Sequence, residues 1–236
     1  MKDIEHIVVF TGAGISAESG LSTFRDNGGL WDKYDVYEIA SPQGWTHNPE
    51  LVLRFYNERL QSLLRAKPNA AHYAIASLEE CFKVSVVTQN VDDLHERAGS
   101  LNVIHLHGEL RKARSTVDPN LEYPMKETGI RMGELCEKGS QLRPGVVWFG
   151  EAVRNFEQAC TAVESADIFL VVGTSLAVYP AASLVDMARG SAGKYIINPE
   201  LTNKPREYEW IKAKAAEGVP ALVKEWKQKN KKKIIK

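Results

Sequence analysis

Residues 10–26, FTGAGISAESGLSTFRD, constrain the fold of this chain more than any other segment. They follow a short β-branched run, Ile7–Phe10, which predicts a buried strand. Gly12, Gly14 and Ala17 then give the spacing G-x-G-x-x-A. When such a turn joins a strand to a helix, it brings main-chain N–H groups and the positive end of the helix dipole to a dinucleotide pyrophosphate. The same turn also occurs as an ordinary α/β connection, so on its own it leaves a binding role and a structural role open.

The order of apolar runs predicts an α/β fold. Strand-like runs alternate with helical patterns along most of the chain, which is typical of a doubly wound, mostly parallel sheet. The predicted strands are Ile7–Phe10, Val84–Val87, Val103–Leu106, Val146–Phe149, Ile168–Gly173 and Tyr195–Ile197. The predicted helices are Glu50–Leu64, Ala70–Phe82, Asn155–Ser165 and Pro180–Ala188. Residues 27–70 and 111–142 interrupt this alternation and are candidates for a smaller lobe.

Composition excludes several classes of protein. The 236 residues carry 30 basic and 30 acidic side chains, so net charge gives no reason to expect binding to nucleic acid or membranes. No apolar run approaches the roughly 20 residues of a membrane span, and the first residues lack a signal-peptide pattern. Cys81, Cys136 and Cys160 form neither a disulfide framework nor a C-x-x-C site, which fits the reducing cytoplasm. The lysine-rich residues 224–236 are interpreted as a solvated helix end rather than a nucleic-acid patch.

Polar side chains follow the predicted strand Val84–Val87. Gln89, Asn90 and Asp92 together offer donors and acceptors suited to ribose hydroxyls and a carboxamide. An open α/β sheet binds its ligands at the carboxyl ends of its strands, where these residues are expected to lie. The alternative is a polar cap for the next helix, with Asn90 or Asp92 as the N-cap residue.

Two histidines lie at the end of the next predicted strand, Val103–Leu106. His107 precedes a glycine and is well placed to act as a general base, because the ordinary pKa of histidine is about 6.5. A histidine at such a position is also commonly a structural hydrogen-bonding residue. His105 lies two residues earlier and therefore on the same face of the strand. Spacing alone does not choose between the two.

Two further turns complete the candidate site. Gly173, Thr174 and Ser175 form a small-residue turn that is either an ordinary loop or the second half of a dinucleotide crevice. Asn198 follows the predicted strand Tyr195–Ile197, where its amide could meet the adenosine ribose.

Taken together and in order, these motifs resemble those of the sirtuins, the NAD-dependent protein lysine deacylases. The resemblance is carried by GAGISAESGLSTFRD, TQNVDDLHERAG, HLHGEL, PGVVWFGE and GTSLAVYPAA, and it runs from about Ile7 to the region of Asn198. It implies a Rossmann-type large domain of residues 1–26, 71–110 and 143–236. Residues 27–70 and 111–142 would be two insertions that form the small lobe, with NAD and an acyl-lysine peptide bound between the two parts.

The resemblance also implies roles for individual residues. His107 matches the family's catalytic base, which decides against His105, and Asn90 and Asp92 join it as catalytic residues. The positions that match NAD contacts are Gly12, Ala13, Gly14, Ser16, Phe24, Arg25, Trp31, Gln89, Asn90, Asp92, Gly173, Thr174, Ser175, Asn198 and Ala216. The positions that match the strand pairing with the substrate peptide are Val147, Trp148 and Phe149.

Tyr56 and Arg59 resemble the Y-x-x-R signature of sirtuins that accept acidic acyl groups such as succinyl-lysine. Residues three apart share a helix face, so a phenol hydroxyl and a guanidinium could meet one carboxylate. Ala40 resembles the small residue that opens the acyl pocket in the same branch. The helical spacing alone is more typical of an Arg59 that faces solvent and a Tyr56 that packs in the core. The surrounding sirtuin-like motifs favour a role of both residues in an acyl pocket.

The chain departs from the family pattern in its cysteines. Most sirtuins carry four zinc-binding cysteines between the His-Gly motif and the PGVVW segment, whereas residues 111–142 contain one cysteine, Cys136, and no histidine. Ser115 stands near the position expected for the first cysteine. Because a structural zinc site needs four ligands, we expect a small lobe that holds its shape without zinc.

The resemblance implies a cytoplasmic enzyme of the bacterial-type, class III branch that removes acetyl, succinyl and malonyl groups from lysine. NAD would be consumed as a co-substrate, with nicotinamide and O-acyl-ADP-ribose as products. A plain deacetylase and an NAD-dependent protein ADP-ribosyltransferase are the alternatives. A non-catalytic NAD-binding module is disfavoured by His107, and a hydride-transferring dehydrogenase by the glycine pattern. The expected partners are acyl-lysine proteins or peptides, not nucleic acid or membranes, and the oligomeric state is not predicted.

Overall fold

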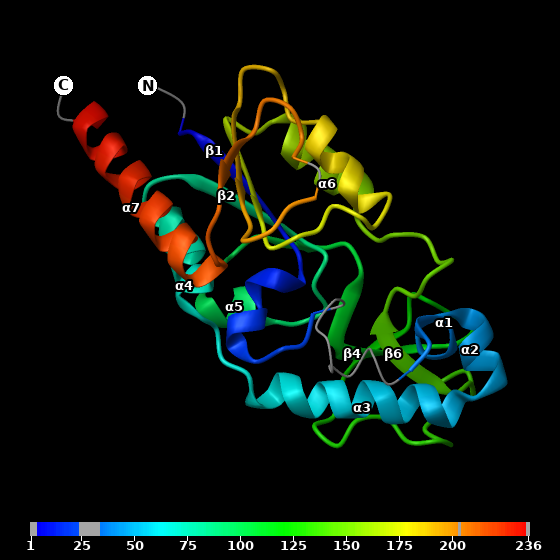
Figure 1. Ribbon diagram of the computed structural model, residues 1–236. Coiled ribbons are helices and arrows are strands. Elements are labelled where there is room, and N and C mark those ends of the chain that lie inside the picture. The colour runs from blue at the N-terminus through cyan, green and yellow to red at the C-terminus, as the bar shows by residue number, and fades with distance from the viewer. Residues whose placement is uncertain (1–3, 24–33, 203, 235–236) are drawn as a thin grey trace.

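The computed structural model describes residues 4–23, 34–202 and 204–234 (Figure 1). Three of the predicted NAD contacts, Phe24, Arg25 and Trp31, lie outside the described residues. The larger sheet has six parallel strands in the order β3-β2-β1-β7-β8-β9. Their bounds are β1 His6–Thr11, β2 Lys83–Thr88, β3 Val103–His105, β7 Ile168–Val172, β8 Gly193–Ile197 and β9 Glu209–Ile211. This sheet confirms the predicted Rossmann-type, doubly wound architecture.

The strand order changes direction between β1 and β7. Starting from β1, the chain first builds outward through β2 and β3, and then returns to add β7, β8 and β9 on the other side. In open parallel sheets, ligands bind beyond the carboxyl ends of the strands at such a switch point. The turns that follow β1 and β7 are therefore the expected position of the binding site.

Helices cover both faces of the larger sheet. Ile7 and Val9 of β1 pack in one buried cluster with residues of α4 (Ala70–Ser77) and α7 (Ala215–Ile234). Val8 and Phe10 point to the opposite face and pack against α6 (Phe156–Glu164) and a 3₁₀ helix, Ala181–Asp186. Figure 1 shows α4 and α7 on one side of the sheet and α6 on the other. Burial on both faces explains why β1 is a continuous apolar run rather than an alternating one.

A second, antiparallel sheet has the order β5-β4-β6, with bounds Glu122–Pro124, Gly108–Ser115 and Leu142–Val146. It packs with three helices, α1 (Val36–Ile39), α2 (Pro42–His47) and α3 (Pro49–Arg65). The long helix α3 begins where Asn48 caps it, because Oδ1 of Asn48 accepts a hydrogen bond from the N–H of Leu51 at 3.0 Å. In Figure 1, α3 runs along the bottom of the molecule below β4 and β6.

Several predicted elements differ from the structure. The expected strand Val146–Phe149 is wrong: β6 ends at Val146 and belongs to the second sheet. The N–H of Val147 instead donates to the carbonyl of His107 (2.8 Å), and the N–H of Phe149 to that of Ala40 (2.9 Å). The glycine turn after β1 leads into two short 3₁₀ turns, Ala13–Ile15 and Ala17–Ser19, rather than an α-helix.

Other differences concern element type and extent. The predicted helix Pro180–Ala188 is the 3₁₀ helix Ala181–Asp186, and the helix predicted over Ala70–Phe82 divides into α4 and a 3₁₀ turn, Leu78–Glu80. The segment 111–142, predicted to be irregular, contains β5 and most of β4. The short helix α5, Leu94–Ala98, ends at Gly99, whose φ of +105° suits a glycine.

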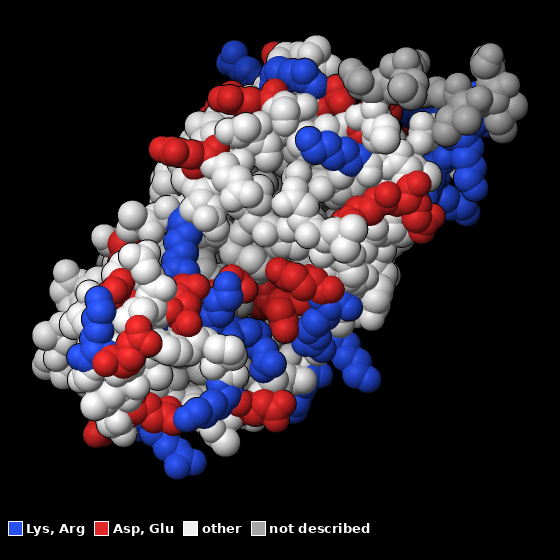
Figure 2. All heavy atoms as spheres, turned by 180° about the vertical axis from the view of Figure 1, so that it is seen from behind, with Lys and Arg blue, Asp and Glu red and all other residues white. Residues whose placement is uncertain are grey.

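Among the described helices, none has both the length and the apolar character that a membrane span requires. Figure 2, seen from behind, shows acidic and basic side chains intermingled over the lower part of the molecule, in keeping with the formal net charge of zero.

Candidate active site

The two glycine turns lie against each other at the switch point. The N–H of Gly14 donates to the carbonyl of Gly173 at 2.8 Å, and the N–H of Gly12 donates to that of Val172 at 3.0 Å. A Cβ atom added to Gly14 would come within 2.7 Å of the Gly173 oxygen, and one added to Gly12 within 2.7 Å of Cβ of Thr174. Gly173 itself has φ of +61°. Glycine is therefore required here by the contact between the two turns, before any ligand is considered.

Polar side chains connect the carboxyl ends of β2, β7 and β8. Nε2 of Gln89 donates to Oγ1 of Thr174 at 2.8 Å, and Nδ2 of Asn198 donates to the main-chain oxygen of Thr174 at 2.8 Å. Nε1 of Trp210 in turn donates to the main-chain oxygen of Asn198 at 2.9 Å. Ser175, the next residue of this turn, is exposed. Three of the predicted NAD contacts are thus brought together by hydrogen bonds among themselves.

Ser16, Asn90 and Asp92 form a second polar group, and all three are buried. Oγ of Ser16 donates to Oδ2 of Asp92 at 2.9 Å and accepts a bond from Nδ2 of Asn90 at 3.2 Å. Burial raises the pKa of Asp92, while the hydrogen bonds from Ser16 and the N–H of Leu94 oppose that rise. Oδ1 of Asp92 also accepts the N–H of Leu94, the first residue of α5, at 3.2 Å, although the N-cap residue itself is Asp93 rather than the predicted Asn90 or Asp92. The binding role of Asp92 stays a prediction.

The structure distinguishes the two histidines chemically. Nδ1 of His107 lies 2.9 Å from the main-chain oxygen of Gln89. A carbonyl can only accept, so Nδ1 carries the proton and Nε2 of the neutral ring is left as an acceptor. Burial lowers the pKa of His107, which keeps the ring neutral at ordinary pH. His107 therefore has the tautomer and charge state that a general base needs.

His105 has the opposite character. Its Nδ1 lies 3.2 Å from the main-chain oxygen of Asn90, and its Nε2 lies 2.7 Å from a carboxylate oxygen of Glu96. Burial alone would lower the pKa of His105, but the hydrogen bond and charge of Glu96 outweigh it, so the pKa is raised. Both ring nitrogens of His105 face acceptors, which is the pattern of a structural hydrogen-bonding residue.

The main-chain N–H groups of the segment Val147–Phe149 each donate a hydrogen bond. Besides the bonds of Val147 to His107 and of Phe149 to Ala40, the N–H of Trp148 donates to Oε2 of Glu151 at 2.8 Å. The Trp148 ring is buried, with the guanidinium carbon of Arg143 at 3.1 Å from its centroid. The Phe149 side chain is 38% exposed and lies beside Tyr37.

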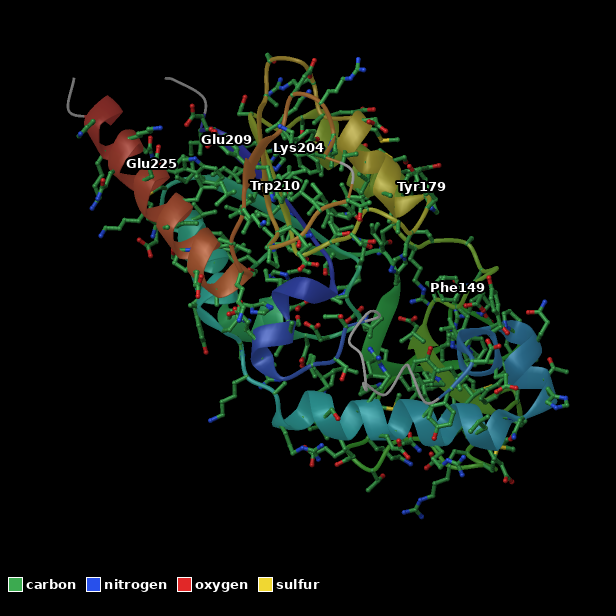
Figure 3. The ribbon with its side chains drawn as sticks, in the orientation of Figure 1. Phe149, Tyr179, Lys204, Glu209, Trp210 and Glu225 are labelled. Carbon is green, nitrogen blue, oxygen red and sulfur yellow. The ribbon has the colours of Figure 1, made fainter. Side chains whose placement is uncertain are left out.

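Figure 3 shows Phe149 on the same side of the molecule as Tyr179, with Tyr179 nearer the larger sheet. Tyr179 is 72% exposed. Two exposed aromatic rings, one after β6 and one after β7, thus lie on the same side of the molecule.

Glu151 joins two buried arginines. Its carboxylate lies 2.8 Å from Nη2 of Arg114 and 2.6 Å from Nη1 of Arg143. Burial lowers the pKa of Arg143 to about 10, and Glu151 opposes that shift. Charge-assisted hydrogen bonds of this kind are stronger than neutral ones. The group therefore fixes the Trp148 main chain, to which Glu151 is also bonded.

Tyr56 and Arg59 lie on α3, close to both of these groups. Burial raises the pKa of Tyr56 to about 12, and the charges of Arg59 and Arg143 act against that rise. Burial lowers the pKa of Arg59, while Tyr56 and Asp92 raise it. Arg59 is thus half-buried and close enough to Asp92 for the charge of that carboxylate to favour the charged guanidinium. Its guanidinium carbon also lies 5.8 Å from the centroid of the Phe55 ring.

Comparison with known proteins agrees with this arrangement. The family model described as the Sir2 family matches residues 12–180, which is well over half of the chain.

This chain belongs to the Sir2 family.

A relative from Bacteroides thetaiotaomicron, named NAD-dependent protein deacylase, is 50% identical over 226 residues, which cover 93% of this chain and 97% of the relative. A solved Sir2 homologue in complex with NAD has a TM-score of 0.85 and 42% identity, over 97% of this chain and 91% of that one. A Sir2 homologue in complex with ADP-ribose has a TM-score of 0.86 and 42% identity, over 96% of this chain and 94% of that one.

The region where most Sir2 family members are expected to hold zinc is arranged differently here. Sγ of Cys136 donates to Oγ of Ser115 at 3.3 Å, and the N–H groups of Val117 and Asp118 both donate to that hydroxyl at 3.2 Å. Lys138 and Asp118 form an ion pair at 2.7 Å beside them. Within residues 4–23, 34–202 and 204–234, no group of three or more His, Cys, Asp or Glu side chains could hold a metal. The absence of zinc stays a prediction.

Ala216, the last predicted NAD contact, lies in the first turn of α7. Its N–H donates to Oε2 of Glu18 at 2.8 Å, which ties the start of α7 to the glycine segment. Glu18 was not among the predicted site residues. Nor were Thr11, Thr88 and His95, which form a buried hydrogen-bonded group behind the site. The only signal for the two threonines was their position directly after a predicted strand.

Proposed function

We propose that this protein is an NAD-dependent protein lysine deacylase that removes acetyl and acidic acyl groups, such as succinyl and malonyl, from lysine side chains. The observation that carries the proposal is the bond from Nδ1 of His107 to the Gln89 carbonyl, at 2.9 Å, which leaves Nε2 free to accept a proton. Family membership and the names of the relatives support the reaction class. Acyl-lysine proteins or peptides are the proposed substrates.

The residues present fit NAD. The two glycine turns provide main chain without side chains at the switch point, as close approach to a pyrophosphate requires. Gln89, Asn198, Ser16 and Asp92 offer hydrogen-bonding groups from the ends of β2, β8 and the glycine segment. We propose these residues, together with the other predicted contacts, as the NAD site.

NAD, when bound, supplies nicotinamide as a leaving group and ADP-ribose as the acceptor of the acyl group. The protein's own groups would then act on the ribose. His107 would take a proton from a ribose hydroxyl through Nε2, while the Gln89 carbonyl stabilises the positive charge that develops on the ring. Asn90 and Asp92, both buried and linked through Ser16, would orient the ribose. The segment Val147–Phe149 would hold the substrate peptide.

The acidic-acyl preference rests on α3. Tyr56 and Arg59 lie one helical turn apart, and the pKa of Arg59 responds to both Tyr56 and Asp92. A guanidinium in this position can bind both oxygens of a carboxylate, with the phenol hydroxyl as a second donor. Ala40 is buried next to Phe149 and would leave room for a longer acyl chain.

We also propose that the chain is divided into a large domain and a small lobe. Separate buried clusters lie on the two faces of the larger sheet and within the second sheet with its helices. Because β4 begins at Gly108 and the second cluster includes Trp148, the packing favours a small-lobe insertion of residues 108–148 rather than 111–142.

One experiment tests the function directly. The protein is incubated with NAD and with two peptides of one sequence that differ only in an acetyl or a succinyl group on lysine. Mass spectrometry of all products should find free lysine peptide, nicotinamide and O-acyl-ADP-ribose in equal amounts. Transfer of ADP-ribose to protein with retention of the acyl group would support the ADP-ribosyltransferase alternative. Deacetylation without desuccinylation would reduce the proposal to a plain deacetylase.

A further inference from the structure

A chain of buried hydrogen bonds runs behind the candidate site. Nε2 of His95 lies 3.1 Å from Oγ1 of Thr11, and this hydroxyl donates to Oγ1 of Thr88 at 2.8 Å. Oγ1 of Thr88 also accepts the N–H of Asn90 at 3.0 Å. The three side chains are between 0% and 1% exposed. This chain of bonds, from His95 through Thr11 and Thr88 to Asn90, is called the histidine–threonine chain below.

In the histidine–threonine chain, the donor and the acceptor of each hydrogen bond can be assigned. The single hydroxyl proton of Thr11 is donated to Thr88, so Thr11 can only accept from His95. Nε2 of His95 must therefore carry a proton. Burial keeps the pKa of His95 well below its ordinary value, so the ring is neutral and Nδ1 is unprotonated.

A second buried imidazole, that of His72, packs against the His95 ring. Nδ1 of His72 accepts the N–H of Asn69 at 3.3 Å, so the proton of this ring lies on Nε2. The rings of His72 and His95 are 4.9 Å apart at an angle of 61°. Among the described residues, neither Nε2 of His72 nor Nδ1 of His95 has a hydrogen-bond partner. The two rings therefore pack edge to face behind the site without a hydrogen bond between them.

The histidine–threonine chain ends at the turn of residues 88–90, which holds most of the site together. The carbonyl of Gln89 accepts Nδ1 of His107, and the carbonyl of Asn90 accepts Nδ1 of His105. The side chains of Gln89 and Asn90 bond to Thr174 and Ser16. A shift of this turn would therefore move the base and both polar groups together. Misplacement of catalytic groups by about 1 Å can cost on the order of 100-fold in rate.

We propose that Thr11, Thr88 and His95 are positioning residues for the NAD-consuming reaction. They touch neither substrate nor cofactor in this role and act by fixing the main chain of the 88–90 turn. The proposal rests on the proposed function for its rate effects, but its effect on NAD affinity is independent of turnover.

Two variants of Thr88 and a matched control test the proposal. Thr88→Val keeps the shape of the side chain and removes the hydroxyl, and Thr88→Ser restores the hydroxyl. Ser85→Ala is the control: Ser85 lies on the same strand, is 3% exposed and bonds Nε2 of His6 at 2.9 Å, but stands three residues nearer the amino end. For each protein, we would measure the NAD dissociation constant by calorimetry, KM for NAD and for peptide, kcat and Tm.

We expect Thr88→Val to weaken NAD binding and lower kcat by about 10- to 100-fold, with KM for the peptide nearly unchanged. Thr88→Ser should recover most of both losses, whereas Ser85→Ala should lower Tm and leave the NAD dissociation constant as it is. Wild-type NAD affinity and kcat in Thr88→Val would overturn the proposal, as would equal losses in Ser85→Ala.

If Thr88→Val does not fold, Thr11→Val interrupts the same chain one bond further from the turn. It should give the same pattern with smaller changes, and unchanged NAD affinity there would equally overturn the proposal. A wild-type protein that binds NAD but deacylates no peptide would refute the proposed function instead. In that case the NAD affinities of the variants still decide whether the histidine–threonine chain positions the turn.

Discussion

The main-chain carbonyl of Gln89 accepts a hydrogen bond from Nδ1 of His107 over 2.9 Å. This contact determines which ring nitrogen can act as a base, because it holds the proton on Nδ1 and leaves Nε2 unprotonated. The same residue uses its side-chain amide to bond Thr174 after β7. Gln89 therefore links the candidate base His107 to the turn after β7 without being charged itself.

His107→Ala should lose deacylation by about 10²–10⁴-fold, the usual cost of removing a general base. NAD affinity should be nearly unchanged, since the glycine turns and Asn198 remain in place. Turnover of an acetyl-lysine peptide and calorimetric NAD binding are the measurements. His105→Gln is the comparison variant, because His105 bonds Glu96 and is predicted not to act as the base. A His107→Ala enzyme with near wild-type turnover would show that the base lies elsewhere.

The pH dependence of kcat/KM should reflect the lowered pKa of His107. A general base must be unprotonated, so activity should fall as the pH decreases through this pKa, which lies below the ordinary 6.5. Between pH 7 and 8 this group should cause little change. A rate profile recorded with a peptide lacking titratable side chains would check this. If the fall in kcat/KM caused by His107 had an apparent pKa above 7, burial would not lower the pKa of this histidine as proposed.

Arg59→Met should abolish desuccinylation and spare deacetylation, because acetyl-lysine lacks the carboxylate that Arg59 is proposed to bind. Loss of a charge-assisted contact in an enclosed site costs about 2–5 kcal/mol, which is roughly 30-fold or more in kcat/KM. Tyr56→Phe should act in the same direction but more weakly. Arg54→Met, an exposed arginine on the same helix, is the control. The measurement is the ratio of succinyl to acetyl activity, and an equal loss of both would exclude the acidic-acyl site.

Glu151→Gln should destabilise the protein and weaken peptide binding. Neutralising Glu151 removes the carboxylate that is hydrogen-bonded to the buried Arg114 and Arg143, which costs about 3–5 kcal/mol and roughly 6–20 °C in Tm. It also weakens the bond that holds the Trp148 N–H, so KM for the peptide should rise. Glu134→Gln removes a pair with the exposed Lys126 and should change Tm little. Similar Tm values for both variants would contradict the role of Glu151.

Purified protein should contain no stoichiometric zinc, and chelators should leave its Tm unchanged. Ser115 and Cys136 bond each other directly, and a closed zinc site would need four ligands. Elemental analysis after dialysis checks the first point and thermal denaturation with a strong chelator the second. One tightly bound zinc per chain would refute the prediction.

The sequence predicted those parts of the fold in which a local pattern carries the signal. Strands β1 and β7 are buried on both faces and read as continuous apolar runs, so they were recognisable. Strand β4, GELRKARS, was missed because it is rich in charged residues and its pairing with β6 is irregular between Gly108 and Ala113. Helix α7 was missed before Lys224 because Gly218 and Pro220 interrupt its helical pattern.

Within the site, residue types were predictable and their chemical states were not. Spacing placed His105 and His107 on one strand face, but their different roles depend on Glu96 and on the Gln89 carbonyl. The contact between His72 and His95 joins residues 23 positions apart in the sequence, and no local pattern indicates it.

The contact between the two glycine turns has a consequence for how this site can change over evolutionary time. A protein usually tolerates a larger side chain when a neighbouring residue becomes smaller. Gly14 and Gly173 already lack side chains, and an added Cβ on either would meet main-chain atoms of the other at 3.0 Å or less. No second substitution at the partner position could therefore rescue the first. Gly14 and Gly173 are thus expected to stay glycine together.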